Sequence, residues 1–582
     1  MSLLQTLSAI TGEAFIAEGL PAEMGHVRVS DRPDLAQFQC NGAMAAAKAA
    51  KKNPRAVAEA IVARLQDNPI FSKIEIAGPG FINLNITDAA LSDYLAGIAK
   101  DARAGVEPQG HGETIVLDYG GPNVAKHMHV GHLRSSIIGD SLRRILLFAG
   151  YDAKGDVHLG DWGTPMGMLL ADPEVYAEAD RVDMNNPQEV QDFVDFLGVA
   201  YPRASAAFKE NAENAALAQQ KTFLIQNRDP EHYPRWQKMK DASISVIKKN
   251  FESLGVSFDL WLGESDVHDL IAPMVEDLKK RGYAVEDDGA IVVHVKGNED
   301  TKEYPPLILY KRDGAVMYST TDLATVVQRM RDLKPLKIIY IVDRRQSLHF
   351  EQVIRASRLT GIAPESVEMT HIGYGTMNGT DGKPFKTRAG GVMKLEDLID
   401  MGIQKAMARL QEANLAQDAD AGELNDIAYK VAIAAIKFAD LQNQPQSDYI
   451  FDLDRMTSFE GKTGPYILYQ AVRIKSLLRK AEAQGDKPGN ALVLQDAERP
   501  LALLLTELPQ VIDQSLKNYT PHVICDYAYR LANAFSSFYG NCHILSETDP
   551  ALKASRLLLC RMVRDQLALV LGLLGIDVPE RM

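Results

Sequence analysis

Apolar and polar residues alternate in different ways along the chain, and the middle part opens with the pattern of a β-strand followed by an α-helix. The apolar run at 115–117 predicts a buried strand. In the next segment, apolar residues recur every three or four positions, which predicts an amphipathic helix that ends at Gly150. The residues expected on its packed face are Leu133, Ile137, Ile138, Leu142, Ile145 and Leu146. A strand, a glycine-bearing turn and a helix in this order predict the start of a βαβ unit.

Two further strands are predicted at 291–295 and 337–342. The second is almost entirely apolar, as in a parallel sheet that is covered on both faces. The pairs Asp288-Gly289 and Asp313-Gly314 lie between β-rich runs and predict hairpins. Because hairpins are not expected within a parallel sheet, we expect a largely helical insertion at roughly 168–300.

The first part of the chain, to about residue 110, reads as a separate unit. Helical patterns are predicted across 38–65 and a strand-like stretch at 74–86, before a polar, glycine-rich linker at 105–112. Four basic residues gather near the end of one helix, and they indicate either a solvated helix end or a weak phosphate-contacting patch: Lys48, Lys51, Lys52 and Arg55. From about residue 400 the pattern becomes helical.

Composition narrows the function classes. The net charge of −14 excludes a nucleic-acid assignment based on overall charge, although local basic faces remain possible on an acidic protein. None of the four cysteines forms a CxxC pair, so we expect neither a disulfide scaffold nor a cysteine-based zinc site, and a reducing cytoplasm is the expected compartment. No apolar run is long enough for a membrane span, and the first residues lack the basic start of a secretory signal.

The segment at 120–134, GGPNVAKHMHVGHLR, carries the candidate chemistry. His129 and His132 bracket Gly131 where the strand turns into the helix. The N–H groups at a helix start favour a bound phosphate, and glycine allows a nucleotide close to the backbone. Two imidazoles there are able to donate hydrogen bonds to phosphate oxygens, and Lys126 lies within reach of the same group. The HxGH pattern alone is weak, and two surface histidines are the alternative interpretation.

PNVAKHMHVGHLR resembles the signature of class I aminoacyl-tRNA synthetases, and most closely that of the arginyl-tRNA synthetases. The residues concerned are Pro122, Asn123, Val124, Ala125, Lys126, His127, Met128, His129, Val130, Gly131 and His132. Further blocks resemble the family in the same order: HLGDWGTPMG, LWLGESD, MYSTTDLAT, YIVDRRQSLHF, GKPFKTRAGG and LLGIDVPERM. The resemblance therefore extends over essentially the whole chain.

The resemblance implies the fold and the reaction. It implies an α/β fold with a Rossmann-type parallel-sheet catalytic domain, an inserted subdomain, a small α/β N-terminal domain and an all-α C-terminal bundle. It implies that L-arginine and ATP form arginyl-adenylate and pyrophosphate, after which the arginyl group passes to tRNA(Arg) with release of AMP. ATP is expected as a substrate with Mg²⁺ and no zinc. The family further implies a cytoplasmic monomer without a membrane or an obligate protein partner.

The resemblance also implies an arginine site. A guanidinium is planar and permanently charged, so a selective pocket needs carboxylate acceptors, and by position in the family blocks these are Glu264 and Asp322. Tyr318, four residues before Asp322, is expected to bind or stack on the guanidinium. For the α-ammonium group the corresponding residues are Asp118, Asn123 and Gln346. Taken singly, an Asp or Asn before a helix is commonly an N-cap.

A second nucleotide element departs from the class pattern Lys-Met-Ser-Lys-Ser. Here the sequence keeps both lysines, Lys383 and Lys386, but has Pro-Phe between them. Lys126 is expected to share their role, and which lysine dominates ATP activation stays open; a solvated basic loop is the alternative. Further pocket candidates are His158 and Asp161, with Gly373 and Gly375 as a turn against adenine. Lys462, where relatives commonly have Asn, has no account.

The expected domains are an N-terminal tRNA-contacting domain at 1–110, a catalytic domain at 111–400, a connecting helical segment at 401–450 and an anticodon-binding domain at 451–582. Two other functions are compatible with parts of the sequence. Another HxGH nucleotidyltransferase is disfavoured because such chains are much shorter and lack a helical RNA-binding domain. A catalytically silent tRNA-binding paralogue is disfavoured because the histidines, lysines and acidic residues are all present.

Overall fold

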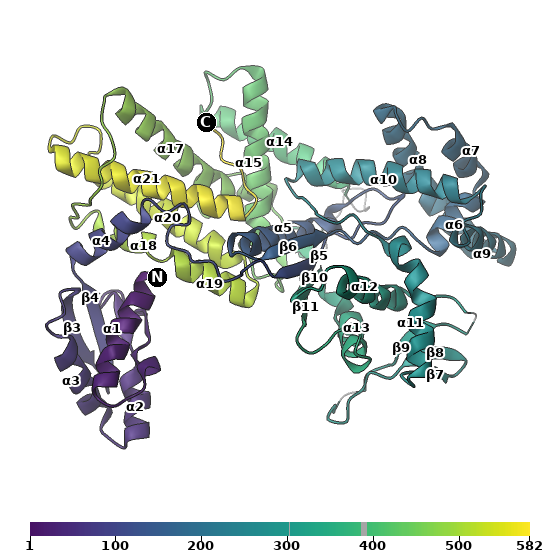
Figure 1. The fold of residues 1–582 in the computed structure, drawn as a ribbon. Coiled ribbons are helices and arrows are strands. Elements are labelled where there is room, and N and C mark those ends of the chain that lie inside the picture. The colour runs from purple at the N-terminus through teal and green to yellow at the C-terminus, as the bar shows by residue number, and fades with distance from the viewer. Residues whose placement is uncertain (302, 313, 384, 386–392) are drawn as a thin grey trace.

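In the computed structural model, which describes residues 1–301, 303–312, 314–383, 385 and 393–582, four strands form a central sheet in the order β11-β10-β5-β6 (Figure 1). The strands are β5 (Thr114–Asp118), β6 (Asp152–Asp156), β10 (Lys337–Asp343) and β11 (Glu368–Tyr374). All neighbouring strands in this sheet run parallel. This confirms the predicted α/β class with a parallel sheet.

The connections between the strands of this sheet place a topological switch point at their carboxyl ends. Helix α5 (Leu133–Phe148) joins β5 to β6, α13 (Ser347–Leu359) joins β10 to β11, and α12 (Tyr318–Asp332) precedes β10. All six residues predicted for the packed face of α5 are buried. The chain leads from β5 to β6 at one edge of the sheet and from the adjacent β10 to β11 at the other edge. The carboxyl ends of β5 and β10 therefore form a topological switch point, and open α/β sheets bind ligands in the crevice outside such a point.

A helical insertion follows β6, as predicted. Its helices are α6 (Thr164–Ala171), α7 (Pro173–Arg181), α8 (Pro187–Glu210), α9 (Ala212–Gln226) and α10 (Tyr233–Ser253). The turn η3 (Glu264–Val267) and helix α11 (His268–Lys280) lead to an antiparallel sheet of β7 (Ala284–Asp287), β8 (Ala290–Val293) and β9 (Leu307–Tyr310). The predicted hairpin at Asp288-Gly289 joins β7 to β8. Of the second predicted pair, Asp313 lies outside the described residues. Strand β9 pairs with β8, so this sheet extends past residue 300.

The N-terminal part is a small sheet with helices packed on it. Its strands β1 (Val27–Val29), β2 (Phe38–Cys40), β4 (Phe81–Ile86) and β3 (Phe71–Ala77) form an antiparallel sheet in that order. The helices are α1 (Leu3–Ala17), α2 (Gly42–Ala50), α3 (Pro54–Leu65) and α4 (Asp88–Ile98), with a short turn η1 (Ala22–Gly25).

Two predictions for the N-terminal part were wrong. Residues 38–40 form a strand instead of a helix, because Phe38 and Cys40 pair with β1 and β4 and are both buried. The single strand predicted at 74–86 is a hairpin of two strands that turns at Gly78–Gly80, where both glycines have positive φ.

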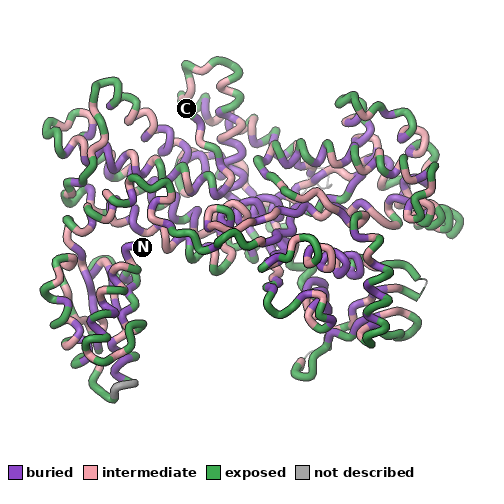
Figure 2. The backbone as a smooth tube through the Cα atoms, in the orientation of Figure 1, coloured by how far each residue is buried: buried purple, intermediate pink, exposed green. Residues whose placement is uncertain are grey.

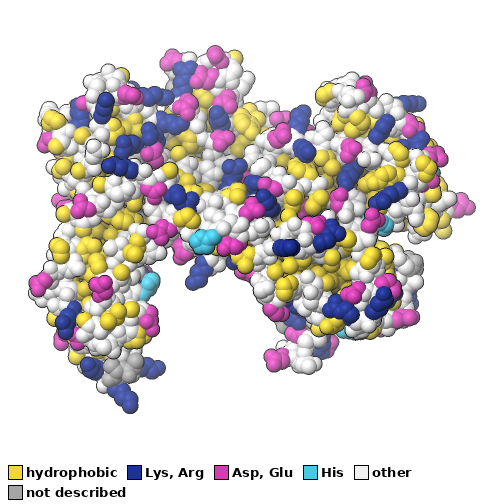
Figure 3. All heavy atoms as spheres, in the orientation of Figure 1, with side chains coloured by type: hydrophobic (Ala, Val, Ile, Leu, Met, Phe, Trp, Pro, Cys, Tyr) yellow, Lys and Arg dark blue, Asp and Glu magenta, His cyan; other side chains and the backbone are white. Residues whose placement is uncertain are grey.

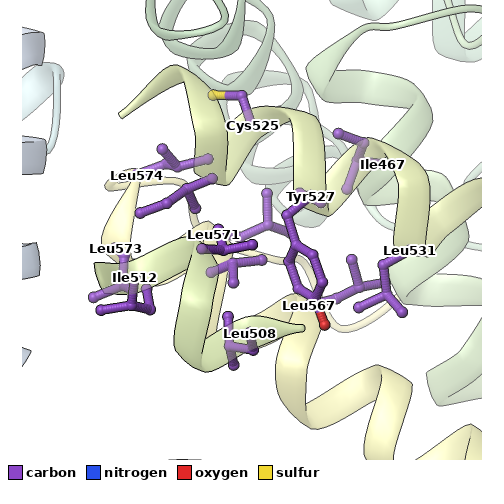
Figure 4. Close-up of a cluster of buried hydrophobic side chains, with 14 of the residues drawn as sticks. Ile467, Leu508, Ile512, Cys525, Tyr527, Leu531, Leu567, Leu571, Leu573 and Leu574 are labelled. Atoms are coloured by element: carbon purple, nitrogen blue, oxygen red, sulfur yellow. The ribbon is translucent and has the colours of Figure 1, made fainter. Parts of the chain in front are cut away.

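The C-terminal part is helical, as predicted. Its elements are α14 (Leu395–Glu412), α15 (Ala421–Leu441), α16 (Leu453–Met456), α17 (Gly464–Ala483), α18 (Arg499–Leu505), α19 (Leu508–Asn518), α20 (His522–Asn541) and α21 (Pro550–Leu573). A short parallel pair, β12 (Met377–Asn378) with β13 (Tyr449–Ile450), links it to the end of β11. Figure 4 shows Leu508, Tyr527, Leu567 and Leu571 packed together from α19, α20 and α21. Phe535 and Phe538 are also buried in this core.

Basic side chains of α17 contact the C-terminal tail of the chain. Lys475 lies 2.9 Å from the Glu580 carboxylate, and Arg479 donates to the Glu580 carbonyl, 3.1 Å away. These contacts hold the C-terminal tail against α17. The described helices include none that is both long and apolar enough to cross a membrane.

The N-terminal sheet lies below the C-terminal helices in Figure 1 and apart from the central sheet. Ser92 of α4 donates to the carbonyl of Leu492 and accepts from its N–H, at 3.1 and 3.2 Å. Arg499 of α18 donates to the carbonyl of Ile86, 2.7 Å away. Figure 2 shows that buried residues follow the central strands and the inner sides of the helices. The two ends of the chain are therefore joined to each other beside the central sheet.

Candidate active site

Three extended segments lie side by side at the carboxyl ends of β5 and β6 and form the frame of the site. The chain after β6 pairs at Gly160 with Asn123 of the signature segment and, on its other side, at Leu159 with Gly263. The N–H of Glu264 donates to the carbonyl of Leu159, 3.1 Å away. The histidine-bearing turn and Glu264 are thus fixed on two neighbours of the same segment.

The signature segment contains buried apolar residues and polar residues that are partly or fully exposed. Val124, Ala125, Met128 and Val130 are buried. Backbone hydrogen bonds connect Val130 and Met128 with Met393 and Leu395, just beyond a segment outside the described residues. The start of α14 therefore holds the signature turn in place from behind.

His129 and His132 are oriented by backbone hydrogen bonds. Nδ1 of His129 accepts from the N–H of Gly131 at 3.0 Å, and Nδ1 of His132 accepts from the N–H of His129 at 3.1 Å. Their rings stack with centroids 4.1 Å apart. Since Nδ1 is the acceptor in both rings, the neutral form of each carries its proton on Nε2.

Both imidazoles are held neutral. Burial, with the neighbouring His129, lowers the pKa of His132 to about 3, and burial with the charge of Lys126 lowers the pKa of His129. Neutral rings with Nε2–H groups are hydrogen-bond donors that need not lose a proton to approach an anion. This turn is able to hold phosphate oxygens.

The lysines around this turn differ in their contacts. The ammonium of Lys126 lies 4.1 Å from the ring centre of Tyr201 in α8, a cation–π contact. Lys383 is exposed, and Phe385 packs against Phe451 at 5.1 Å between ring centres. Lys386 lies outside the described residues.

Asp322 is the centre of the acidic part of the site. Its Oδ2 lies 2.5 Å from Nε2 of His349, and its Oδ1 lies 3.5 Å from Nε2 of His158. Burial alone would raise the pKa of Asp322, but the hydrogen bonds from His158 and His349 outweigh burial and hold the pKa well below its usual range. Asp322 is therefore a carboxylate at neutral pH.

His158 carries a positive charge into this pocket. Burial would lower its pKa, but Asp322 and the charge of Asp118 raise it to about 9. Its φ of +41° is uncommon for a residue other than glycine, and such backbone conformations cluster at functional sites. One buried imidazolium thus lies among several carboxylates.

Glu264 is a carboxyl group of a different kind. Burial raises its pKa to about 7, and the negative charges of Asp161 and Asp322 add to this effect, whereas His158 opposes it. Asp161 beneath it is buried and accepts from the hydroxyl of Ser265 at 2.6 Å, and Lys240 lies 2.6 Å from the same carboxylate. Asp161 therefore supports the turn that carries Glu264 and does not face the pocket freely.

Asp118 and Asp156, the last residues of β5 and β6, share one buried arginine. Arg329 of α12 lies 2.5 Å from the Asp118 carboxylate and 2.7 Å from that of Asp156. Burial raises the pKa of Asp118, while Arg329 and His158 oppose that rise. Nε and one terminal nitrogen of Arg329 have no hydrogen-bond partner among the described residues. Asp118 is thus engaged from below by a fixed cation.

The other predicted residues lie at the rim. Tyr318 begins α12 and is exposed, with its ring 4.6 Å from that of His349. Asn123 and Gln346 are exposed, Gln346 at the end of the turn η4 (Arg344–Gln346).

The glycines do not form the predicted turn. Gly373 lies within β11, opposite Val342. Gly375 packs so closely that a Cβ would stand 2.6 Å from the backbone of Ser447. The reason is that β11 ends at Tyr374, so Gly373 lies within the strand and Gly375 directly after it.

Sequence reasoning missed His349, Arg329, Asp156 and Lys240 as members of the site. One signal was present for Arg329, which lies seven residues after Asp322 and therefore on the same helical face, where a buried charge is unusual. The contacts of His349 and Lys240 are tertiary and leave no local pattern.

Three family models match successive parts of the chain. They are the N-terminal domain of arginyl-tRNA synthetases at residues 2–86, the catalytic domain of class I tRNA synthetases (R) at 96–453 and the DALR anticodon binding domain at 467–582.

Similar proteins cover the whole chain. The arginine–tRNA ligases of Hyphomonas neptunium and Maricaulis maris are 48% and 47% identical to it, with 100% of each chain aligned. The arginyl-tRNA synthetase structure from Plasmodium falciparum has a TM-score of 0.80 and 25% identity over 100% of this chain and 99% of that one. That from Thermus thermophilus has a TM-score of 0.78 and 22% identity over 100% of both, a likeness of fold.

Proposed function

Since this chain belongs to the arginyl-tRNA synthetases and charges tRNA(Arg) with arginine through an arginyl-adenylate at the expense of ATP, we propose that Asp322 and Glu264 receive the guanidinium. The observation that carries this proposal is the frame of the site, in which Glu264 and the signature turn flank one extended segment. A carboxylate at Asp322 offers two oxygens to the parallel N–H groups of the substrate. Tyr318, which is exposed at the rim of the site, covers the plane of the guanidinium.

The α-ammonium group of arginine binds at Asp118, Asn123 and Gln346. Asp118 ends β5 directly below the turn, and its pairing with Arg329 leaves its second oxygen, Oδ1, as an acceptor. Asn123 and Gln346 are exposed on either side of the switch point. His158 is a cation that lies between the carboxylates of the site. Asp161 supports the turn that carries Glu264.

His129 and His132 hold the phosphates of ATP through their Nε2–H groups, next to Gly131. In the first step the arginine carboxylate attacks the α-phosphorus, the bond to the bridging oxygen breaks, and pyrophosphate leaves with the electron pair. Neutral donors aimed at the phosphate oxygens stabilise the charge that shifts during this displacement. Lys126, Lys383 and Lys386 supply positive charge for the leaving pyrophosphate. The Lys126 ammonium contacts the Tyr201 ring, and a rotation of the Lys126 side chain brings it to the phosphates.

The tRNA contacts lie at the two ends of the chain. The proposed domains are 1–110 for the outer part of the tRNA and 451–582 for the anticodon, with the catalytic domain at 111–400 and a connecting segment at 401–450. Lys and Arg side chains protrude at the lower tip of the N-terminal part (Figure 3). Lys48, Lys51 and Lys52, at the end of α2, are exposed. Exposed lysines without carboxylate partners suit a phosphate backbone.

Mg²⁺ enters with ATP and supplies charge neutralisation on the phosphates. The described residues include no group of three or more His, Cys, Asp or Glu side chains arranged to hold a metal, so a phosphate-borne ion fits this site better than a resident one. The protein acts without zinc, as a monomer without an obligate protein partner. The four buried thiols suit a reducing cytoplasm.

The deciding experiment is ATP–pyrophosphate exchange with each of the twenty amino acids, with and without tRNA(Arg). Exchange that appears only with arginine and tRNA would support the proposed site in its complete form. Exchange with another amino acid and no tRNA would indicate a different nucleotidyltransferase chemistry, and tRNA binding with no exchange would indicate a silent paralogue.

A further inference from the structure

We propose that His349 is a positioning residue for arginine recognition and acts by holding the Asp322 carboxylate in the orientation that a guanidinium requires. This inference rests on the proposed role of Asp322. His349 lies on α13, Asp322 on α12, and His158 follows β6, so three separate elements meet at one carboxylate.

The two oxygens of Asp322 face two different imidazoles. Oδ2 lies 2.5 Å from Nε2 of His349, the closer of the two contacts, and Oδ1 lies 3.5 Å from Nε2 of His158. A carboxylate has about four lone-pair positions, so one on each oxygen remains free when each accepts a single hydrogen bond. Two free positions, one on each oxygen, match the two parallel N–H groups along the edge of a guanidinium.

The ring of His349 is fixed by aromatic neighbours. Its centroid lies 4.6 Å from that of Tyr318 and 5.0 Å from that of Phe350, and the residue is 8% exposed. Phe350 in turn stacks on His371, with 4.9 Å between centroids. The hydrogen bond to Asp322 is therefore made by a side chain with little freedom to rotate, which is the condition for precise placement of an acceptor.

His349 also connects two residues expected to contact the same substrate group. Asp322 accepts its hydrogen bond, and Tyr318 packs against its ring, one helical turn earlier in α12. Without the Nε2 donor, Asp322 can rotate about its side-chain bonds, and one of the two guanidinium hydrogen bonds is lost in most orientations. We expect this loss to appear in arginine binding and not in ATP binding, because the signature turn is held by separate contacts.

The test compares two amide substitutions. In His349→Gln the side-chain N–H₂ reaches the position of Nε2, whereas in His349→Asn it reaches only that of Nδ1. We expect His349→Asn to raise the KM for arginine about 10–100-fold, the range for a hydrogen bond to a charged group. His349→Gln should stay within about threefold of the unchanged protein. The KM for ATP should change by less than about threefold in both, measured by aminoacylation of tRNA(Arg).

His371→Leu is the matched control. It disturbs the same aromatic stack, but Nε2 of His371 contacts the carbonyl of Val342, 3.1 Å away, and not Asp322. We expect its KM for arginine to stay within about threefold. A rise equal to that of His349→Asn would assign the effect to packing and overturn the proposal.

Asp322→Asn separates this inference from the proposed function. If His349 acts through Asp322, the double variant His349→Asn/Asp322→Asn should have the same KM for arginine as Asp322→Asn alone, within about threefold. Effects that multiply would overturn the positioning role, as would equal KM values for His349→Asn and His349→Gln. If Asp322→Asn leaves the KM for arginine unchanged, the proposed function of Asp322 fails first.

Discussion

At the scale of single residues, the site holds two carboxyl groups, Asp322 and Glu264, whose pKa values are shifted in opposite directions. Asp322 accepts a hydrogen bond from His349 and pairs with His158 at 3.5 Å, whereas partial burial and the like charges of Asp161 and Asp322 act on Glu264. The same chemical group therefore has a pKa well below its usual range at one position and of about 7 at the other.

This difference predicts a pH dependence of arginine use. A guanidinium favours ionised Glu264, so below a pH of about 7 the substrate must bind with loss of a proton from Glu264. We expect kcat/KM for arginine to fall about tenfold per pH unit below that value and to level off above it. His158, with a pKa of about 9, stays protonated over this range.

Aminoacylation at saturating ATP and tRNA, from pH 5.5 to 8.5, measures this profile. The variant Glu264→Gln should lose the dependence on pH and have a lower kcat/KM at pH 8. A profile that is unchanged in Glu264→Gln would assign the titration to another group.

The neutral imidazoles of the signature turn lead to a second prediction. His132→Ala removes one Nε2–H donor, and we expect the rate of arginine- and tRNA-dependent pyrophosphate exchange to fall about 10²–10³-fold. The affinity for tRNA, measured by filter binding, should change less than about twofold because this turn lies within the crevice. A loss of tRNA affinity instead would contradict the phosphate role.

The residue types of the site could be predicted from sequence, but their contacts could not. The resemblance of the family blocks implies Asp322 and Glu264, while the side chains that contact Asp322 come from α13 and from the segment after β6. Nothing near Asp322 in the sequence specifies which side chains from other elements will reach it.

At the scale of elements, local sequence patterns predicted the helices and turns whose conformation depends on neighbouring residues in the chain. The spacing of apolar residues gave the buried face of α5, and the Asp288-Gly289 pair gave the β7–β8 turn. Phe38–Cys40 was assigned to a helix because the strand is only three residues long, too short for a period of two to emerge. Its conformation depends on the neighbouring strands.

The turn before α5 permits a test at Gly131. A Cβ on this residue would stand 2.7 Å from Cε1 and 2.8 Å from Nδ1 of His129, so Gly131→Ala must displace the ring. We expect the exchange rate to fall about 10–100-fold, because small misplacements of this kind disturb the alignment of reacting groups. The urea midpoint of unfolding should hardly change, since Gly131 is exposed. An unchanged exchange rate would show that the position of His129 does not matter.

Helix α5 is also tied to α15 by a buried ion pair. Arg134 lies 3.1 Å from the Asp440 carboxylate, and both side chains are almost completely buried. Arg134→Met would leave Asp440 buried without a counter-charge, and we expect a loss of about 3–5 kcal/mol in the free energy of unfolding. The double variant Arg134→Met/Asp440→Leu should recover most of this loss in urea denaturation. If the double variant is as unstable as Arg134→Met, the loss of stability comes from the change in side-chain volume and not from the unpaired charge of Asp440.

At the scale of the whole molecule, the N-terminal part is seated on the C-terminal helices and not on the central sheet (Figure 1). Hydrogen bonds of Ser92 with Leu492 and of Arg499 with Ile86 join the two parts, and this contact area is called the seat of the N-terminal part. This arrangement could not be predicted from sequence, because the paired residues are separated by most of the chain and contain no shared motif.

This seat predicts an effect confined to tRNA. The double variant Ser92→Ala/Arg499→Ala should loosen the N-terminal part, increase the radius of gyration in X-ray scattering and raise the KM for tRNA about 3–10-fold. The KM for arginine should be unchanged because the crevice lies elsewhere. A larger radius of gyration with an unchanged KM for tRNA would argue against tRNA contact by this part.

The same seat has a consequence for biosynthesis. The N-terminal part leaves the ribosome first, but Leu492 and Arg499, on which it rests, are translated about 400 residues later. At about 5–20 residues per second, the residues that the N-terminal part docks onto are synthesised roughly 20–80 s after it. Until then its own sheet and helices lack this support, so docking onto the C-terminal helices is a late step of assembly.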